Sequence, residues 1–315
     1  MSIVIGGGIT GTIIANQLKH VDLPVQVLEQ SNNHGRLKTE EADVGAQFFT
    51  VRSEEFKELV DHWEDQELVK VWSKGFPPKN DGNNRYCAVD GMEALVDHLS
   101  QSIDIQYETT VESIQETDKE FVIKTNHGEL KSDHVILTAP LPKSVDLVKH
   151  ILPKDDLQEL QQVEYYPCIS LVITLDKPLK ISDSGAYQLK GKVVDFVANN
   201  HTKGVTNDDI ITIHCSPDFS EQYFNAKESD IIVKVQQELS NVNELKSIPF
   251  STVKMLKWDY SQPKQPYKQS SYSYKNKNKL LVIAGDGFGS SKIEGACLSA
   301  LDASNTLFKD YQVFQ

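Results

Sequence analysis

The first thirty residues alternate between the hydrophobic patterns of strands and of a helix. Residues 2–5 are a short apolar run that ends in glycine, which predicts a buried strand. Across residues 9–19 the apolar positions recur at helical spacing, and residues 24–29 form a second short apolar run. The chain therefore opens with a strand–helix–strand unit, as parallel α/β sheets do.

The rest of the chain continues as a mixture of helices and strands. Capped or amphipathic patterns predict helices over residues 53–69, 91–100, 228–239 and 293–308. Short apolar runs predict strands over residues 103–107, 111–115, 121–125, 135–138, 169–175, 193–198, 210–214, 253–258 and 280–284. Residues 76–84 and 261–279 are polar and contain proline, so we expect connections there.

A glycine-rich loop lies between the first strand and the first helix. Gly6-Gly7-Gly8-Ile9-Thr10-Gly11 fits G-x-G-x-x-G, in which Gly6 allows the tight turn, Gly8 a close pyrophosphate, and Gly11 helix packing on the strand. The helix N-terminus then offers free N–H groups to phosphates. Glu29 follows 18 residues after Gly11, where an acid accepts hydrogen bonds from an adenosine ribose. These features predict a Rossmann-type dinucleotide-binding domain.

Two segments after Glu29 point to a flavin. Gly35-Arg36-Leu37-Lys38-Thr39 resembles the GGRxxT stretch of the flavin-containing amine oxidase superfamily, with His34 where the family has its first glycine. Asp43-Val44-Gly45-Ala46-Gln47-Phe48-Phe49-Thr50 resembles the DxGAQYxT segment of renalase-like flavoproteins. The resemblance implies that Arg36 meets the FAD pyrophosphate and that the backbone at Gly45 and Ala46 passes the flavin ring.

The C-terminal region carries a second nucleotide-like segment. A predicted strand runs into Gly285-Asp286-Gly287, and Ser291-Lys292-Ile293-Glu294 fits a capping box that opens the last helix. Asp286 is placed to accept hydrogen bonds from ribityl hydroxyls, and the helix N-terminus to stabilise negative charge on a reduced flavin. This segment resembles the closing FAD motif of the same superfamily, so FAD is favoured over NAD as the bound cofactor.

These two segments lie at opposite ends of the chain, which predicts discontinuous domains. We expect a Rossmann-type FAD-binding domain of residues 1–50, 101–145 and 270–315. Residues 51–100 and 146–269 would form an inserted α+β substrate domain. The expected cofactor-binding residues are Gly6, Gly8, Ile9, Thr10, Gly11, Glu29, Gln30, Gly35, Arg36, Leu37, Gly45, Ala46, Gln47, Phe48, Val111, Gly285, Asp286, Ile293, Glu294 and Ala296. Cys297 falls on the apolar face of the last helix, so we expect non-covalent FAD.

Within the superfamily, the chain is most similar to renalase-like oxidases. Trp258-Asp259-Tyr260 with Pro263 resembles the RWxYxxP stretch, with Lys257 in the arginine position. The resemblance implies three catalytic residues that converge over the flavin, Tyr187, His214 and Trp258. From the residues alone, a core histidine and a core tryptophan in half-buried strands explain His214 and Trp258 as well.

The resemblance implies an oxidase. Isomeric dihydronicotinamide nucleotides, 2- or 6-dihydro-NAD(P), would be oxidised to NAD(P)+ by hydride transfer to FAD, and O2 reduced to H2O2. A flavin amine oxidase or a related desaturase shares the FAD motifs and stays an alternative. A non-catalytic flavin- or NAD-binding regulatory protein is a second alternative.

Composition and charge exclude several other classes. The 315 residues include 45 acids and 32 bases, and a net charge of −13 argues against a nucleic-acid partner. The four cysteines form no CxxC pair and the nine histidines no HxH or HxxxH, so no metal site is expected. The chain has no apolar run of 18 residues, and its N-terminus lacks a signal peptide's basic region. We expect a soluble, cytoplasmic protein with no membrane partner.

Overall fold

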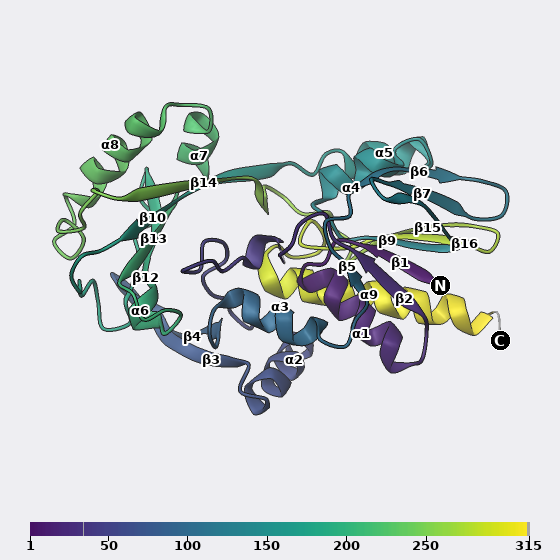
Figure 1. Ribbon diagram of the computed structural model, residues 1–315, viewed down its shortest axis with the longest axis horizontal. Helices are drawn as coiled ribbons and strands as arrows, with labels where there is room; N and C mark the ends of the chain where they lie inside the picture. Colours follow the sequence, from purple (N-terminus) through teal and green to yellow (C-terminus); the bar gives the residue numbers. More distant parts are fainter. Residues whose placement is uncertain (34, 314–315) are drawn as a thin grey trace. The chain divides into compact units, whose positions relative to one another are not determined.

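The computed structural model describes residues 1–33 and 35–313, and the chain separates into two compact units (Figure 1). Unit 1 consists of Met1–Gly35, Val96–Glu164 and Gln262–Gln315, and unit 2 of Arg36–Leu95 and Tyr165–Ser261. Both units are therefore assembled from segments that lie far apart in the sequence.

Unit 1 is built on a six-stranded sheet in the order β15-β16-β9-β1-β2-β5. The strands are β1 (Ser2–Ile5), β2 (Val25–Leu28), β5 (Ile105–Gln106), β9 (His134–Leu137), β15 (Tyr272–Asn276) and β16 (Lys279–Ile283). All neighbours pair in parallel except β15, which is antiparallel to β16. Every residue of β1, β9 and β16 is buried, as expected of parallel strands covered on both faces.

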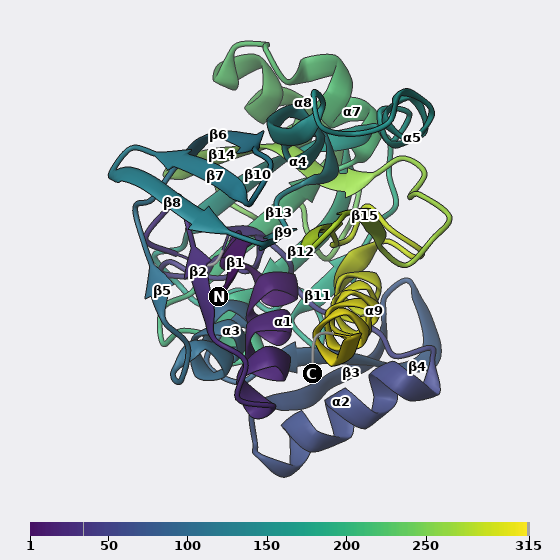
Figure 2. The same cartoon turned by 90° about the vertical axis from the view of Figure 1, so that its right-hand side faces the viewer.

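Helices and a small sheet complete unit 1. These elements are α1 (Ile9–His20), α4 (Leu141–Val148), α5 (Lys154–Leu160), α9 (Lys292–Val313), β6 (Val111–Glu116), β7 (Phe121–Thr125) and β8 (Gly128–Ser132). Helices α1 and α9 lie side by side and both contact the central sheet (Figure 2). The Thr10 hydroxyl donates to the Ala296 carbonyl at 3.2 Å, which joins the N-terminal turns of the two helices. This confirms the predicted Rossmann-type α/β fold.

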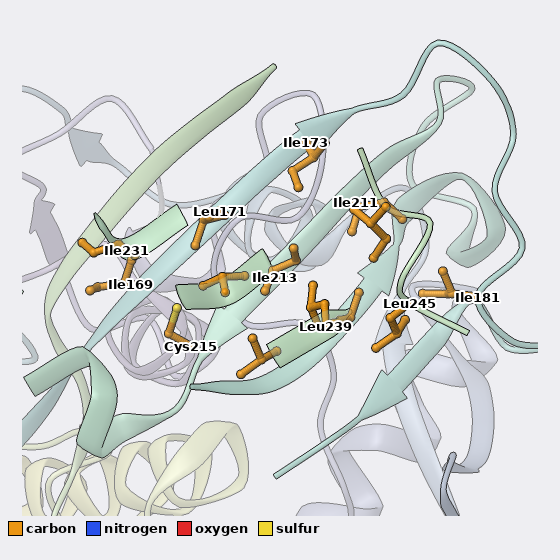
Figure 3. Packing of buried hydrophobic residues seen from close by; sticks show 14 of the residues in the cluster. Ile169, Leu171, Ile173, Ile181, Ile211, Ile213, Cys215, Ile231, Leu239 and Leu245 are labelled. Atoms are coloured by element: carbon orange, nitrogen blue, oxygen red, sulfur yellow. The ribbon is translucent and has the colours of Figure 1, made fainter. Parts of the chain in front are cut away.

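Unit 2 is built on a five-stranded sheet in the order β11-β12-β13-β10-β14, in which the first four strands pair antiparallel. The strands are β10 (Tyr165–Thr174), β11 (Ala186–Gln188), β12 (Val194–Asn199), β13 (Ile210–Cys215) and β14 (Val253–Pro263). One face carries isoleucines, leucines and valines from alternate strand positions, including Leu171 and Ile213, as Figure 3 shows. Helices α7 (Pro217–Tyr223) and α8 (Glu228–Leu239) contact the sheet and contribute to this core.

The opposite face of this sheet has a mixed composition. Phe196 and Ala198 pack there with Phe76, and Phe48 and Trp72 lie against them. The other elements of unit 2 are α2 (Glu54–Asp65), β3 (Val69–Phe76), β4 (Lys79–Ala88) and α6 (Asn200–Lys203). The 3-10 turn η1 (Gly35–Leu37) crosses from the first segment of unit 1 into unit 2. Helix α3 (Met92–Ser100) spans the unit boundary. Figure 1 shows β3 and β4 as a long hairpin.

The structure corrects two predicted connections. Residues 76–84 were expected to be a loop, but most of them belong to the β3–β4 hairpin, where exposed polar side chains are compatible with an uncovered edge. Residues 261–279 were expected to be a polar connection, yet β14 continues to Pro263 and Tyr272–Asn276 pair with β16. Both β4 and β15 pair with the strand next to them in the sequence, and their polar composition concealed these hairpins.

The compact units also differ from the predicted domains at their edges. Residues 36–50 were expected in the FAD-binding domain but lie in unit 2, where they are hydrogen-bonded to β13 and α6. Residues 96–100, 146–164 and 262–269 lie in unit 1. Helices α4 and α5, for example, contact each other, and α4 contacts β6. No helix in the described part of the chain has both the length and the apolar character needed to cross a bilayer.

The core of unit 2 yields a stability prediction. Ile213→Ala removes a fully buried side chain and should lower the free energy of unfolding by about 2–5 kcal/mol. Val233→Ala is the matched control, because Val233 is 50% exposed and should change stability by no more than about 0.5 kcal/mol. Urea denaturation at constant FAD measures both. Equal effects of the two substitutions would contradict the packing described.

Candidate functional site

The glycine loop of unit 1 combines three different requirements. Gly6 has φ +113°, and a Cβ there would lie 2.7 Å from Thr138 Oγ1. A Cβ on Gly11 would lie 2.0 Å from the Gly6 carbonyl oxygen. Backbone conformation and packing within the protein therefore explain both glycines.

Gly8 is different, because the protein itself does not require a glycine there. Its backbone is extended (φ −76°, ψ −175°), and a Cβ would have no heavy atom within 4 Å. Gly8 is the N-cap of α1 and no side chain caps that helix. The loop thus leaves open space at the positive end of a helix, the arrangement that accepts a phosphate group against the backbone.

Glu29 lies beside this loop, one residue after β2. Its Oε2 accepts from Gly7 N–H at 2.7 Å, and its Oε1 accepts from the backbone and hydroxyl of Ser31 at 2.9 and 2.6 Å. Each carboxylate oxygen has two lone pairs, so Oε2 retains acceptor capacity for a ribose hydroxyl. Among the further predicted nucleotide contacts in unit 1, Gln30 is exposed and Val111 is half-buried at the start of β6.

The segment before α9 lies at the same carboxyl edge of the parallel sheet. Gly285 (φ +142°) donates its N–H to Ser299 Oγ at 2.9 Å, and Asp286 is buried. A Cβ on Gly295 would lie 1.4 Å from the Ser290 carbonyl oxygen, so that helix turn also requires glycine. The predicted contacts Ile293, Glu294 and Ala296 are buried in the first turns of α9.

Unit 1 therefore fits FAD. The open space at Gly8, the acceptor at Glu29 and the adjoining N-terminal turns of α1 and α9 would hold an anionic dinucleotide. Cys297 is fully buried, and burial raises the pKa of its thiol, which disfavours the thiolate needed for covalent attachment. No group of three metal-ligating side chains occurs within residues 1–33 and 35–313.

In unit 2, a fully buried ion pair anchors residues 43–47. Asp43 and Lys203 side chains are both 0% exposed, and Lys203 Nζ donates to Asp43 Oδ2 at 2.5 Å and to the Gln47 carbonyl at 2.6 Å. Asp43 Oδ1 accepts from Thr39 Oγ1 at 2.5 Å and from Met92 N–H at 2.8 Å. We call residues 43–47 the Asp43 segment.

The Arg36 region holds the other predicted flavin contacts of unit 2. Arg36 Nη1 lies 3.2 Å from the Ser261 carbonyl oxygen of β14, and the Arg36 carbonyl accepts from Ala46 N–H at 2.9 Å. A Cβ on Gly45 would lie 2.1 Å from the Arg36 carbonyl oxygen. Of the remaining predicted contacts, Gly35 has φ +64° and open space around it, Leu37 is buried, and Phe48 packs in the aromatic cluster. His34 lies outside the described residues.

Three buried side-chain atoms have no hydrogen-bond partner in the described part of the chain. They are Gln47 Oε1, His214 Nε2 and Trp258 Nε1, all in unit 2. The orientation of the Gln47 amide follows from its own bonds, because Nε2 donates to the carbonyls of Asp43 (2.7 Å) and Gly45 (3.1 Å). A buried polar atom without a partner is costly, so these atoms mark a place where a ligand is expected to bind.

Gln47 belongs to the Asp43 segment, and His214 and Trp258 lie on strands β13 and β14 of the unit 2 sheet. His214 pairs with Ser170 on β10 and also bonds the backbone of Val44 in the Asp43 segment. Strand β14 lies on the other side of β10, where Cys168 bonds Ser261. The bond from Lys264 N to Glu164 O, at the end of β14 and the start of β10, indicates that these two strands run antiparallel.

The His214 ring is neutral at physiological pH. Burial lowers its pKa from 6.5 to about 4, and the charge of Lys203 acts in the same direction, against the Val44 bond and Asp43. Since the Val44 bond favours the protonated ring, that ring nitrogen is the donor and is Nδ1. Nε2 is then a buried, unpartnered acceptor.

Tyr187 lies on the other face of the sheet. It pairs with Val197, which pairs with Ile213, and its side chain packs against the isoleucine-rich core. Side chains alternate between faces along a strand, so Tyr187 and Ile213 share a face that His214 does not. The expected convergence of three residues is therefore corrected, because the Tyr187 side chain lies on the face of the sheet opposite that of His214.

Sequence reasoning missed two residues of this site, Lys203 and Asn200. Both lie in α6, and the Asn200 side chain accepts from Asp43 N–H at 3.1 Å. The one signal in the sequence was Asp43 itself, an acid in an otherwise uncharged segment, which would need a cation if it were buried. The sequence did not indicate a partner 160 residues away.

Comparison with known proteins connects these features to one family. Residues 62–307, most of the chain, match the family model described as flavin containing amine oxidoreductase. The fold is similar to a structure from Exiguobacterium sp. 255-15 provisionally named a protoporphyrinogen oxidase (TM-score 0.74, 13% identity, 100% of this chain and 99% of that one). It is also similar to cyclohexylamine oxidase from Brevibacterium oxydans IH-35A (TM-score 0.71, 12% identity, 99% of each chain).

The glycine loop gives a matched pair of variants. Gly8→Val fills space that the protein leaves open, so the variant should stay folded but lose most of its FAD on purification. Gly11→Ala meets the Gly6 carbonyl and should instead lower thermal stability. Flavin absorbance per protein and melting temperature measure the two effects. A full complement of FAD in Gly8→Val would overturn the assignment of this loop.

The lowered pKa of His214 predicts acid sensitivity. The folded protein holds the ring neutral down to a pH of about 4, whereas the unfolded chain protonates it near 6.5, so the unfolded state binds more protons between these values. Stability should fall with decreasing pH across this window, by at most about 3 kcal/mol from this residue. His214→Gln should remove that part of the slope in denaturation curves. If the stability of wild type and of His214→Gln changed with pH in parallel, His214 would not be held neutral in the folded protein.

Proposed function

The chain belongs to the flavin-containing amine oxidoreductase family, with FAD as its cofactor, and on that premise we propose that it oxidises dihydronicotinamide nucleotides. The proposed substrates are the 2- and 6-dihydro isomers of NAD(P), which lose a hydride to become NAD(P)+. Bound FAD supplies the hydride acceptor and passes the electrons to O2, which becomes H2O2. Family membership supports an FAD-dependent oxidoreductase, and the substrate is the part that we propose here.

One observation carries the choice of substrate. Gln47 Oε1 and His214 Nε2 are acceptors and Trp258 Nε1 is a donor, and all three are without partners. A primary carboxamide offers the complement, two N–H donors and one carbonyl acceptor. The carboxamide of a nicotinamide ring therefore matches the hydrogen-bonding needs of this region of unit 2.

The absence of charge on these three groups favours a substrate whose reacting end is uncharged, such as a dihydronicotinamide ring, over a protonated amine. A protonated amine needs a carboxylate partner, whereas Asp43, the acid of the nearby segment, is already paired with Lys203. Amine oxidation must also remove a proton, and His214 is a weak base because its pKa is lowered to about 4. A dihydronicotinamide that loses a hydride becomes an aromatic cation directly and needs no base.

In this proposal the side chains orient the substrate rather than react with it. The carboxamide is held at two ends, by the acceptors Gln47 and His214 and by the Trp258 donor, so the ring cannot rotate freely. Hydride transfer depends on a short, aligned approach, and restricting rotation raises the fraction of productive complexes.

Anaerobic stopped-flow reduction of the flavin tests the proposal. The 2- and 6-dihydro isomers of NAD(P) should reduce it at least tenfold faster than NADPH, NADH or a panel of primary and secondary amines. Rapid reduction by an amine, with none by the dihydro isomers, would assign the chain to the amine-oxidising members of the family. A preparation that contains no flavin would support a regulatory protein instead.

Side-chain variants test the orientation of the substrate. Trp258→Phe keeps the flat ring but removes the N–H donor, and we expect flavin reduction to slow by roughly three- to tenfold, the effect of one neutral hydrogen bond. Tyr187→Phe is the control, since Tyr187 lies on the other face and should not change the rate. FAD content should be normal in both. Equal rates for Trp258→Phe and wild type would refute a hydrogen bond from Trp258.

A further inference from the structure

The Asp43 segment holds two of the three unpartnered atoms in place, Gln47 Oε1 and His214 Nε2. It does so through a few hydrogen bonds. The Gln47 amide nitrogen folds back on the carbonyls of Asp43 and Gly45, so Oε1 is the end that remains available. The backbone of Val44 holds the His214 ring at Nδ1, so Nε2 remains available there. Any displacement of this segment would change both acceptors together.

Lys203 ties both ends of the Asp43 segment. Its Nζ donates to the Asp43 carboxylate at 2.5 Å and to the Gln47 carbonyl at 2.6 Å, and it lies 4.8 Å from the centre of the Trp72 ring. The side chain is fully buried. An ammonium group has three donors, and two of them are used within the protein while the third side faces an aromatic ring. Lys203 is thus poorly placed to bind a substrate itself.

The strand face beneath the segment adds neutral bonds. Thr212 Oγ1 donates to the Asp43 carbonyl at 2.8 Å and accepts from the Asn200 side chain at 2.9 Å. Thr212 lies two residues before His214 on β13, on the same face of the sheet. The histidine and the segment that bonds it are therefore attached to one rigid strand.

We propose that the Asp43–Lys203 ion pair is a positioning device, which fixes the side-chain Oε1 of Gln47 and the Nδ1–H form of His214 for ligand binding. Lys203 acts through the Asp43 segment and is a positioning residue rather than a catalytic one. A purely structural ion pair would affect stability and leave the histidine unchanged. The inference rests on the geometry of unit 2, and only its kinetic readout rests on the proposed function.

The test replaces both charges at once. In Asp43→Asn with Lys203→Met, neither buried charge is left unpaired, so the chain is expected to fold, whereas Lys203→Met alone would leave a buried carboxylate without its cation. Thr212→Val is a milder second variant that keeps the ion pair and loses the bond to the Asp43 carbonyl together with the bond from the Asn200 side chain. FAD content and melting temperature show that each variant is folded.

The decisive measurement is the tautomer of His214. Nitrogen-15 chemical shifts of the holoenzyme report it, and the signals that disappear in His214→Gln are those of His214. Wild type should show a single Nδ1–H form. The double variant should show a mixture of tautomers and at least a tenfold slower flavin reduction with unchanged FAD content, and Thr212→Val a smaller change in the same direction. An unchanged tautomer in either folded variant would overturn the proposal.

The two proposals fail in different ways. If dihydronicotinamides do not reduce the flavin but the tautomer responds to loss of the ion pair, the substrate assignment is wrong and the positioning role holds. If the substrates react and the tautomer does not respond, the positioning role is wrong.

Discussion

The arrangement of unit 2 depends on one buried ion pair. Asp43 and Lys203 are removed from water, and such charges are tolerated only when each has a close partner and further hydrogen bonds. The carboxylate has Thr39 and the Met92 backbone as additional donors, and the ammonium has the Gln47 carbonyl. This requirement permits few positions for residues 43–47 over the sheet, and it links α6 and α3 to a segment that has no regular structure of its own.

In unit 1 the governing constraint is the accommodation of negative charge. A parallel sheet places the carboxyl ends of β1, β2 and β16 at one edge, and the helices that follow β1 and β16 begin there. The Thr10–Ala296 bond holds two positive helix ends together. Gly6 and Gly11 make this geometry possible within the protein, while Gly8 leaves the space that a bound pyrophosphate requires.

The chemistry of the unit 2 face follows from what burial does to polar groups. Desolvation keeps His214 neutral, and the only acid of the Asp43 segment is neutralised by Lys203. The groups that remain for a ligand are therefore uncharged hydrogen-bonding atoms. Under the proposed function, such uncharged groups would suit an amide and offer little to a cation, and this is our reason for proposing a substrate other than an amine.

The sequence by itself determined the features that depend on near neighbours. The glycine spacing, the strand and helix around it, Glu29 and the Gly285–Asp286 turn are local patterns, because each requires a backbone conformation set within a few residues. The tertiary structure decided the rest. The opposite faces of Tyr187 and His214 follow from strand register, and a shift of one residue would exchange them. The Asp43–Lys203 pair joins residues 160 positions apart that only the folded chain brings together, so no local pattern in the sequence encodes it.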